Sequence, residues 1–166
     1  EHPPGFRWLH ESFGTNWRLT EMQAAIGRIQ LEYMDGWNAA RLSNSNRIWD
    51  AASGNRNLRV PHVPSSIRHA GYKCYLFVEN GYRDYYLNHL LQQGISCFTG
   101  SCSEVYLEKA FDNKNLRPSD RLPVANELGE TSLMFPVHPT ISKEYMNKVT
   151  AAIANLPKTK NEYSAD

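Results

Sequence analysis

The sequence has little of what marks several classes of protein. Its cysteines number three, at positions 74, 97 and 102, which are too few and odd in number for a disulfide framework. No apolar run approaches membrane-spanning length, and no signal-peptide pattern opens the chain. Eighteen Lys and Arg residues oppose seventeen Asp and Glu residues, so the net charge of +1 gives no basic excess for nucleic acid or an anionic membrane. We therefore expect a cytoplasmic protein with reduced thiols.

The composition is that of a folded domain. Hydrophobic residues make up 41% of the 166 residues, which is enough for one domain with its own core. The first eight residues, Glu1 to Trp8, do not begin with Met and do not open a regular element. They look like the interior of a longer polypeptide, so we expect the chain to be part of one.

The most informative stretch runs from Gly14 to Leu31. Thr20 and Gln23 have the spacing of a capping box, which predicts that a helix begins here. Apolar residues then recur at helical spacing, at Met22, Ile26, Ile29, Tyr33, Trp37 and Ala40. The pattern predicts a helix that reaches about Ala52, with a bend or break near Asp35–Gly36, because glycine weakens a helix. We expect this apolar stripe to be ordinary core.

The rest of the chain predicts a mixture of short strands and helices. β-forming residues predict strands over 72–78, 95–98 and 131–135. Helices are expected after caps at Asp84, Ser103 and Ser142, and around residues 122–128. The predicted fold class is α+β, a long N-terminal helix plus a small three-stranded sheet with helices packed on one face. We divide it into residues 1–54, a small domain over 55–156 and a polar tail over 157–166.

Three residues just before the long helix are candidates for a binding site. Gly14 allows a turn closed to other residues, and Asn16 and Arg18 follow it. An amide and a guanidinium beside a helix N-terminus suit a phosphate or a carboxylate. The alternative is that Asn16 and Arg18 only brace the turn, with Arg18 paired to Glu21 or another carboxylate.

The stretch also resembles a known family. The run GTNWRLTEMQAAIGRIQL is similar to the G-x-N-[YW]-R-[ML]-[ST]-E-x-Q-A-A-I-G-x-x-Q-L motif of the DegT/DnrJ/StrS sugar aminotransferases, which are pyridoxal-phosphate enzymes of fold type I. The phrases YKCYLFV and LPVANELGETSLMFPVHPTIS also resemble that family. The resemblance covers nearly the whole chain and implies the small C-terminal domain of a fold type I enzyme.

The resemblance implies roles for individual residues. Asn16 matches the asparagine that reaches across the dimer to the cofactor phosphate, and Arg18 matches an arginine at the substrate end of the same cleft. Many family members have a His-Tyr pair where this sequence has Gly100 and Ser101. The hydroxyls of Ser101 or Ser103 can bind substrate, or they can cap the following helix. The family's Schiff-base lysine has no match here, so we assign no catalytic residue to this chain.

The sequence therefore predicts the C-terminal part of a pyridoxal 5'-phosphate-dependent aminotransferase. It would transfer an amino group from an amino acid to a nucleotide-linked keto sugar, as a homodimer with a shared site, and would be inactive without the missing lysine. Gly27 would let a second backbone approach the long helix. A sugar dehydratase of the same fold and a non-catalytic binding or regulatory domain are the alternatives. No metal is expected, because Cys97 and Cys102 lack the rest of a ligand set.

Overall fold

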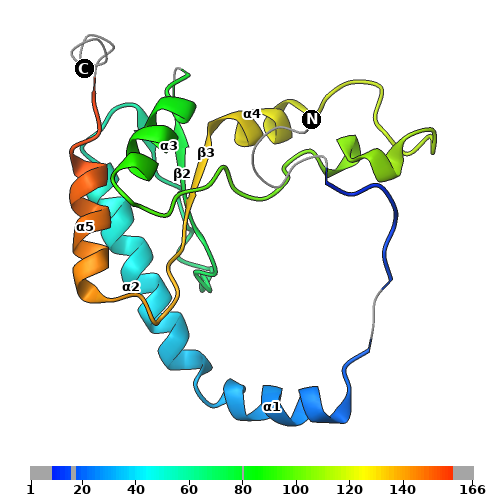
Figure 1. The fold of residues 1–166 in the computed structure, drawn as a ribbon, viewed down its shortest axis with the longest axis horizontal. Coiled ribbons are helices and arrows are strands. Elements are labelled where there is room, and N and C mark those ends of the chain that lie inside the picture. The colour runs from blue at the N-terminus through cyan, green and yellow to red at the C-terminus, as the bar shows by residue number, and fades with distance from the viewer. Residues whose placement is uncertain (1–8, 16–17, 80, 159–166) are drawn as a thin grey trace.

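The computed structural model describes residues 9–15, 18–79 and 81–158, and it has the predicted α+β architecture (Figure 1). Two short 3-10 turns, Val105–Leu107 and Lys109–Phe111, lie between its third and fourth helices. In chain order the other elements are α1 (Glu21–Leu31), α2 (Met34–Ala52), β1 (Leu58–Arg59), β2 (Cys74–Val78), α3 (Arg83–Gln92), α4 (Pro123–Thr131), β3 (Ser132–Phe135) and α5 (Lys143–Ala154).

The three strands form one antiparallel sheet in the order β1-β2-β3. Leu76 lies opposite Leu133, and Leu58 lies opposite Val78. The prediction of β2 and β3 is confirmed, but the predicted strand over 95–98 makes only an isolated bridge between Phe98 and Met134. The third strand is instead β1, whose two residues are too few to give a periodic signal.

The hydrophobic core lies between the sheet and three of the helices. Figure 1 shows α2 and α5 side by side, and both helices and α3 send apolar residues into the same cluster as the strands. Each large apolar side chain removed from water contributes about 1.5–3 kcal/mol. The largest fully buried apolar and aromatic side chains are Tyr86, Phe135, Ile48, Leu76, Leu90, Ile95, Leu133, Met146, Ile153 and Leu156.

The other face of the sheet is more open. Side chains alternate along β2, so Tyr75 and Phe77 lie on the face opposite to the buried Leu76. The guanidinium of Arg59 lies 4.5 Å from the centroid of the Phe77 ring and donates a 2.7 Å hydrogen bond to Glu127 of α4. α4 therefore meets the sheet on the side that does not carry the main core.

The long helix is broken into α1 and α2, slightly before the predicted point. α1 ends at Leu31 and α2 begins at Met34. The capping box at the start of α1 is confirmed: Thr20 N–H donates to Gln23 Oε1 at 2.9 Å, and Gln23 N–H donates to Thr20 Oγ1 at 3.3 Å. In Figure 1, α1 extends away from the sheet and its helices.

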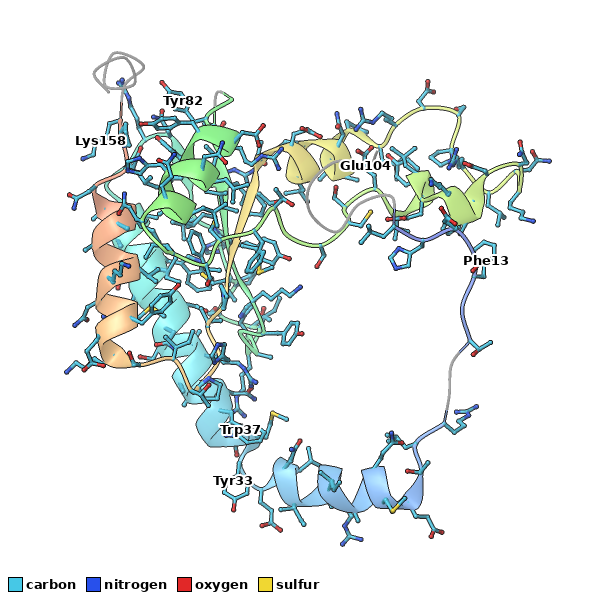
Figure 2. The ribbon with its side chains drawn as sticks, viewed as in Figure 1. Phe13, Tyr33, Trp37, Tyr82, Glu104 and Lys158 are labelled. Carbon is cyan, nitrogen blue, oxygen red and sulfur yellow. The ribbon has the colours of Figure 1, made fainter. Side chains whose placement is uncertain are left out.

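The expectation that the apolar stripe is core is wrong for α1. None of its residues is buried, and Met22 is 77% exposed. Tyr33 is exposed and stacks on the half-buried Trp37, with ring centroids 6.0 Å apart, at the junction of the two helices (Figure 2). Helical spacing shows which face of a helix is apolar, but it does not show whether the same chain covers that face.

The caps at the later helices were predicted with mixed success. Ser142 caps α5, because its hydroxyl accepts a 3.1 Å hydrogen bond from Tyr145 N–H. The cap at Asp84 is wrong: Tyr82 is the N-cap of α3, and Asp84 forms an ion pair with Arg83. An acidic residue is also favourable inside the first turn, so its presence does not fix the first residue of a helix.

The boundary drawn after residue 54 stays a prediction. The structure adds that Ile48 and Ala52 of α2 belong to the same core cluster as the strands, α3 and α5. In the described ranges, no helix is both long enough and apolar enough to cross a membrane.

The contrast between α1 and α2 gives a direct test of where the core lies. Ile48 is fully buried, whereas Ile26 is 58% exposed. Ile48→Ala should lower the free energy of unfolding by about 2–5 kcal/mol, because it leaves a cavity in the core. Ile26→Ala is the matched control and should change it by less than about 0.5 kcal/mol. Urea denaturation of the purified chain, at a concentration where it is monomeric, measures both, and equal losses would contradict the exposed position of α1.

Candidate functional site

The predicted site residues lie on two separate parts of the structure. Asn16 lies outside the described residues. Arg18 precedes α1 and is exposed, and within the described ranges no hydrogen bond or ion pair joins it to Glu21 or another residue. Ser101 lies beside β2 instead. The described part of the chain therefore does not bring Arg18 and Ser101 into contact.

Ser101 belongs to a polar cluster on the open face of the sheet. Its hydroxyl oxygen lies 3.3 Å from Nζ of Lys73 and 3.4 Å from the hydroxyl oxygen of Tyr75. Its backbone N–H also donates to the Tyr75 hydroxyl, at 3.4 Å. The 3-10 turn that follows has Glu104 at its N-cap and no side-chain cap, so the expectation that Ser101 or Ser103 caps this turn is wrong.

Tyr75 lies in β2 and Lys73 lies just before its first residue, and the alternation of the strand explains why both meet the same partner. Successive residues of a strand point to opposite faces, so two residues at spacing two share one face. Cys74 between them is buried in the core. Trp49 of α2 fixes the strand here, because its indole N–H donates a 3.1 Å hydrogen bond to the carbonyl of Tyr75. This alternation is the sequence signal that would have found both residues.

Gly100 lets the chain close over the Tyr75 ring. Its φ of +90° is in the left-handed region that other residues avoid. A Cβ at this position would lie 2.8 Å from Cε1 of Tyr75 and 3.4 Å from Oγ of Ser132. The absence of a side chain at Gly100 therefore sets the distance between Ser101 and Tyr75.

The segment before Gly100 is attached to the edge of the sheet. Phe98 N–H donates to the Met134 carbonyl at 3.0 Å, and Met134 N–H donates to the Phe98 carbonyl at 2.7 Å. The Ser132 hydroxyl then donates a 2.8 Å hydrogen bond to the carbonyl of Thr99. These bonds hold the turn in place, so Ser101 occupies a defined position.

Two adjoining cavities open at this cluster. The first has a volume of about 360 Å³ and is lined by side chains that include His69, Lys73, Tyr75 and Ser101. The second has a volume of about 330 Å³ and is also lined by Lys73, together with apolar side chains such as Phe98 and Met134. A cation, two hydroxyls and an imidazole around one hollow can bind an oxygen-rich ligand. Sequence reasoning identified only Ser101 of this group.

A second polar cluster, around Glu104 and Glu108, finds its hydrogen-bond partners within the chain. Glu104 is only 3% exposed, and its carboxylate accepts hydrogen bonds from Arg121, at 2.9 Å to Nε, and from the Tyr106 hydroxyl at 2.7 Å. Figure 2 shows Glu104 next to α4. Nearby, the buried carboxylate of Glu108 accepts a 2.8 Å hydrogen bond from His10 N–H. We assign these carboxylates a structural role, because removing one partner of a buried ion pair strongly lowers the stability of the fold.

The two buried cysteines, Cys74 and Cys97, and His138 do not form a reactive site. Burial raises the pKa of the Cys74 and Cys97 thiols to about 12, so both are protonated at neutral pH. His138 Nδ1 lies 2.8 Å from the Thr140 hydroxyl. Within the ranges that the structure describes, no three His, Cys, Asp or Glu side chains are grouped as metal ligands would be.

Comparison with known proteins agrees with the fold. The chain belongs to the DegT/DnrJ/EryC1/StrS aminotransferase family, whose model matches residues 3–154. Among solved structures it is similar to an aminotransferase from Psychrobacter cryohalolentis, with 50% identity and a TM-score of 0.76, over 92% of this chain and 42% of that one.

Two curated proteins are also similar. The chain is 30% identical over 147 residues to the erythromycin biosynthesis sensory transduction protein EryC1 of Saccharopolyspora erythraea, over 89% of this chain and 39% of that protein. It is 31% identical over 147 residues to the dTDP-3-amino-3,4,6-trideoxy-alpha-D-glucose transaminase of Streptomyces venezuelae, over 89% of this chain and 38% of that protein. The chain thus spans about two fifths of the length of these relatives.

The close contact at Gly100 predicts a specific cost of a side chain there. Gly100→Ala should lower the free energy of unfolding by about 2–4 kcal/mol, from left-handed strain plus the clash with Tyr75. Gly94→Ala is the matched control, since Gly94 has φ +71° but its added Cβ would meet only the flexible Lys148 Nζ at 3.4 Å. It should cost about 1 kcal/mol. Chemical denaturation measures the free energy of unfolding of both variants. Equal losses would contradict a close contact between residue 100 and the Tyr75 ring.

The buried thiols predict a dependence on alkaline pH. The folded chain holds the protons of Cys74 and Cys97 more tightly than the unfolded chain, whose thiols titrate near 9.0. The contribution of the two thiols to the free energy of unfolding should therefore be constant below that pH and fall as the pH rises toward about 12. At pH 8, iodoacetamide should label both thiols rapidly only after urea is added. Rapid labelling of either thiol in the folded chain would contradict its burial.

Proposed function

We propose that this chain is the C-terminal part of a sugar aminotransferase that moves an amino group from an amino acid to a nucleotide-linked keto sugar. The observation that carries the proposal is the family match over residues 3–154, which includes the whole stretch before and within α1. The transaminase of Streptomyces venezuelae supports a sugar as acceptor, since its name describes an amino sugar carried on dTDP. The reaction also needs a lysine from outside these residues.

The proposed cofactor is pyridoxal 5'-phosphate, with Asn16 donating a hydrogen bond to its phosphate. When bound, the cofactor supplies a carrier for the amino group and an electron sink. The start of α1 fits an anion: the capping box uses the N–H groups of Thr20 and Gln23, so those of Glu21 and Met22 have no acceptor within the helix. Such N–H groups and the helix dipole favour a phosphate.

Substrate contacts are proposed for Arg18 and Ser101. Arg18 is exposed and has a planar fork of donors that suits a carboxylate or a phosphate. Ser101 is held at the mouth of a cavity by the turn at Gly100, where its hydroxyl can hydrogen-bond a sugar or a carboxylate.

A homodimer with a shared site is part of the proposal. α1 exposes Ile26, Ile29 and Met22 on its surface, and apolar area of this kind is usually covered by another protein surface. Apart from the adjacent residues and the backbone of α1 itself, no atom of the described part of the chain would lie within 4 Å of a Cβ at Gly27, which leaves room for a second backbone. The asparagine before α1 would then face the cofactor of the partner protomer.

Two other functions make different predictions. A sugar dehydratase of the same fold would release no new amino sugar when given an amino acid and a keto sugar. A regulatory domain would bind a ligand without turnover, and the similarity to EryC1, which is named a sensory transduction protein, favours this alternative. Incubating the full-length protein with pyridoxal 5'-phosphate, glutamate and nucleotide-linked keto sugars separates the three. An aminotransferase forms an amino sugar together with 2-oxoglutarate, a dehydratase forms a dehydrated sugar without a new amino sugar, and a regulatory domain changes neither substrate.

The role of Asn16 predicts a loss of cofactor affinity. In the full-length protein, Asn16→Ala should weaken binding of pyridoxal 5'-phosphate by about 10- to 100-fold, the effect of one hydrogen bond to a charged group. Cofactor retention after dialysis, measured by absorbance, gives the result. Asn46→Ala, at an exposed asparagine of α2, is the control. Equal retention in both variants would remove Asn16 from the site.

A further inference from the structure

The two cavities on the open face of the sheet share Tyr72 and Lys73, so Lys73 stands at their junction. One cavity is lined by the ammonium of Lys73 and by the hydroxyls of Tyr75 and Ser101. The other is mainly apolar, with Phe98, Met134, Pro136 and Val137 among its lining residues. A ligand that fills both must therefore carry an anionic or oxygen-rich group next to a flat or apolar one.

Lys73 is held at this junction by neighbours on both sides. Its ammonium lies 3.3 Å from the Ser101 hydroxyl and 5.5 Å from the centroid of the Tyr72 ring. The side chain is half-buried, which reduces screening of its charge by water. An ammonium has three N–H donors, and the hydroxyls of Ser101 and Tyr75 can donate as well. Together these groups can surround several oxygen atoms of one anion.

We propose that Lys73 binds the diphosphate of the nucleotide-linked sugar, while the apolar cavity and the ring of Tyr72 receive the base. This assignment rests on the proposed function, since that function supplies a nucleotide-linked substrate. Tyr72 is 75% exposed, so one face of its ring is available for stacking on a base. Lys73 is thus a substrate-binding residue in addition to Arg18 and Ser101.

A phosphate suits this position better than the carboxylate of the amino donor. A lysine ammonium is a compact point charge that binds phosphate oxygens well, whereas the planar carboxylate is matched best by the fork of an arginine. A diphosphate is also joined through ribose to a base, which accounts for the apolar cavity beside the cation. A small amino acid would leave that cavity empty.

The test measures binding of nucleoside diphosphates to the full-length enzyme by isothermal titration calorimetry. dTDP and UDP are the probes, and Lys73→Met is the variant, because it keeps an apolar stem and removes the charge. The dissociation constant should rise about 10- to 100-fold, the effect of losing one charge-assisted hydrogen bond, and the nucleosides without phosphate should be unaffected. Lys73→Arg should recover most of the affinity, and Lys143→Met, at an exposed lysine at the start of α5, should match the wild type.

Steady-state kinetics then shows whether Lys73 binds the diphosphate of the nucleotide sugar or the carboxylate of the amino donor. Lys73→Met should raise KM for the nucleotide sugar by about the same factor and leave KM for the amino donor unchanged. A rise confined to the amino donor would overturn the assignment to the diphosphate, and so would unchanged affinity for dTDP and UDP. Should Lys73→Met melt earlier than the wild type, Lys73→Gln and Tyr72→Ala replace it in the same titration.

Failure of the proposed function gives a different result. A wild-type enzyme that binds dTDP or UDP through Lys73 but forms no amino sugar contradicts the aminotransferase activity and keeps the nucleotide site. A wild-type enzyme that transaminates nucleotide sugars, with Lys73→Met indistinguishable from it, contradicts only the role of Lys73.

Discussion

The turn at Gly100 and the ring of Tyr75 constrain each other, and the open face of the sheet depends on their contact. A Cβ at residue 100 would lie 2.8 Å from Cε1 of the Tyr75 ring, which is too close for a real side chain. The turn can therefore pass over the ring only because residue 100 is glycine. The backbone of Tyr75 is held in place, because its carbonyl accepts a hydrogen bond from the indole N–H of Trp49 and its strand pairs with β3. Ser101 and Lys73 take their positions from this contact, and the cavities form around them.

The structure combines a well-packed unit with a helix that lacks a partner. α2, α3 and α5 bury the sheet face that carries Leu76, so this part has a complete core of its own. α1 has no buried residue, although its capping box and spacing give it a regular helix. A helix of eleven residues is marginal in water without packing. This difference is consistent with the proposed interface at α1, while the sheet and its helices form a stable base for the cavities around Lys73.

Local signals predicted local structure, and contacts distant in sequence were missed. The capping box at Thr20, the cap at Ser142 and the β-rich run of β2 were predicted because neighbouring residues determine them. The pair of Lys73 with Ser101 was missed, because the two are 28 residues apart and meet only when the turn reaches the sheet. The family's His-Tyr pair also gives no guide here, since a histidine in place of Gly100 would overlap the Tyr75 ring.

We propose that the cavities around Lys73 and Ser101 receive the nucleotide end of a sugar substrate. A crystal structure of the full-length protein with a bound nucleotide-linked sugar tests it most directly. We predict phosphate oxygens within about 3.2 Å of Lys73 Nζ and the base in the cavity lined by Phe98 and Met134. A nucleotide bound at another surface, with Lys73 still bonded only within the protein, would contradict the claim.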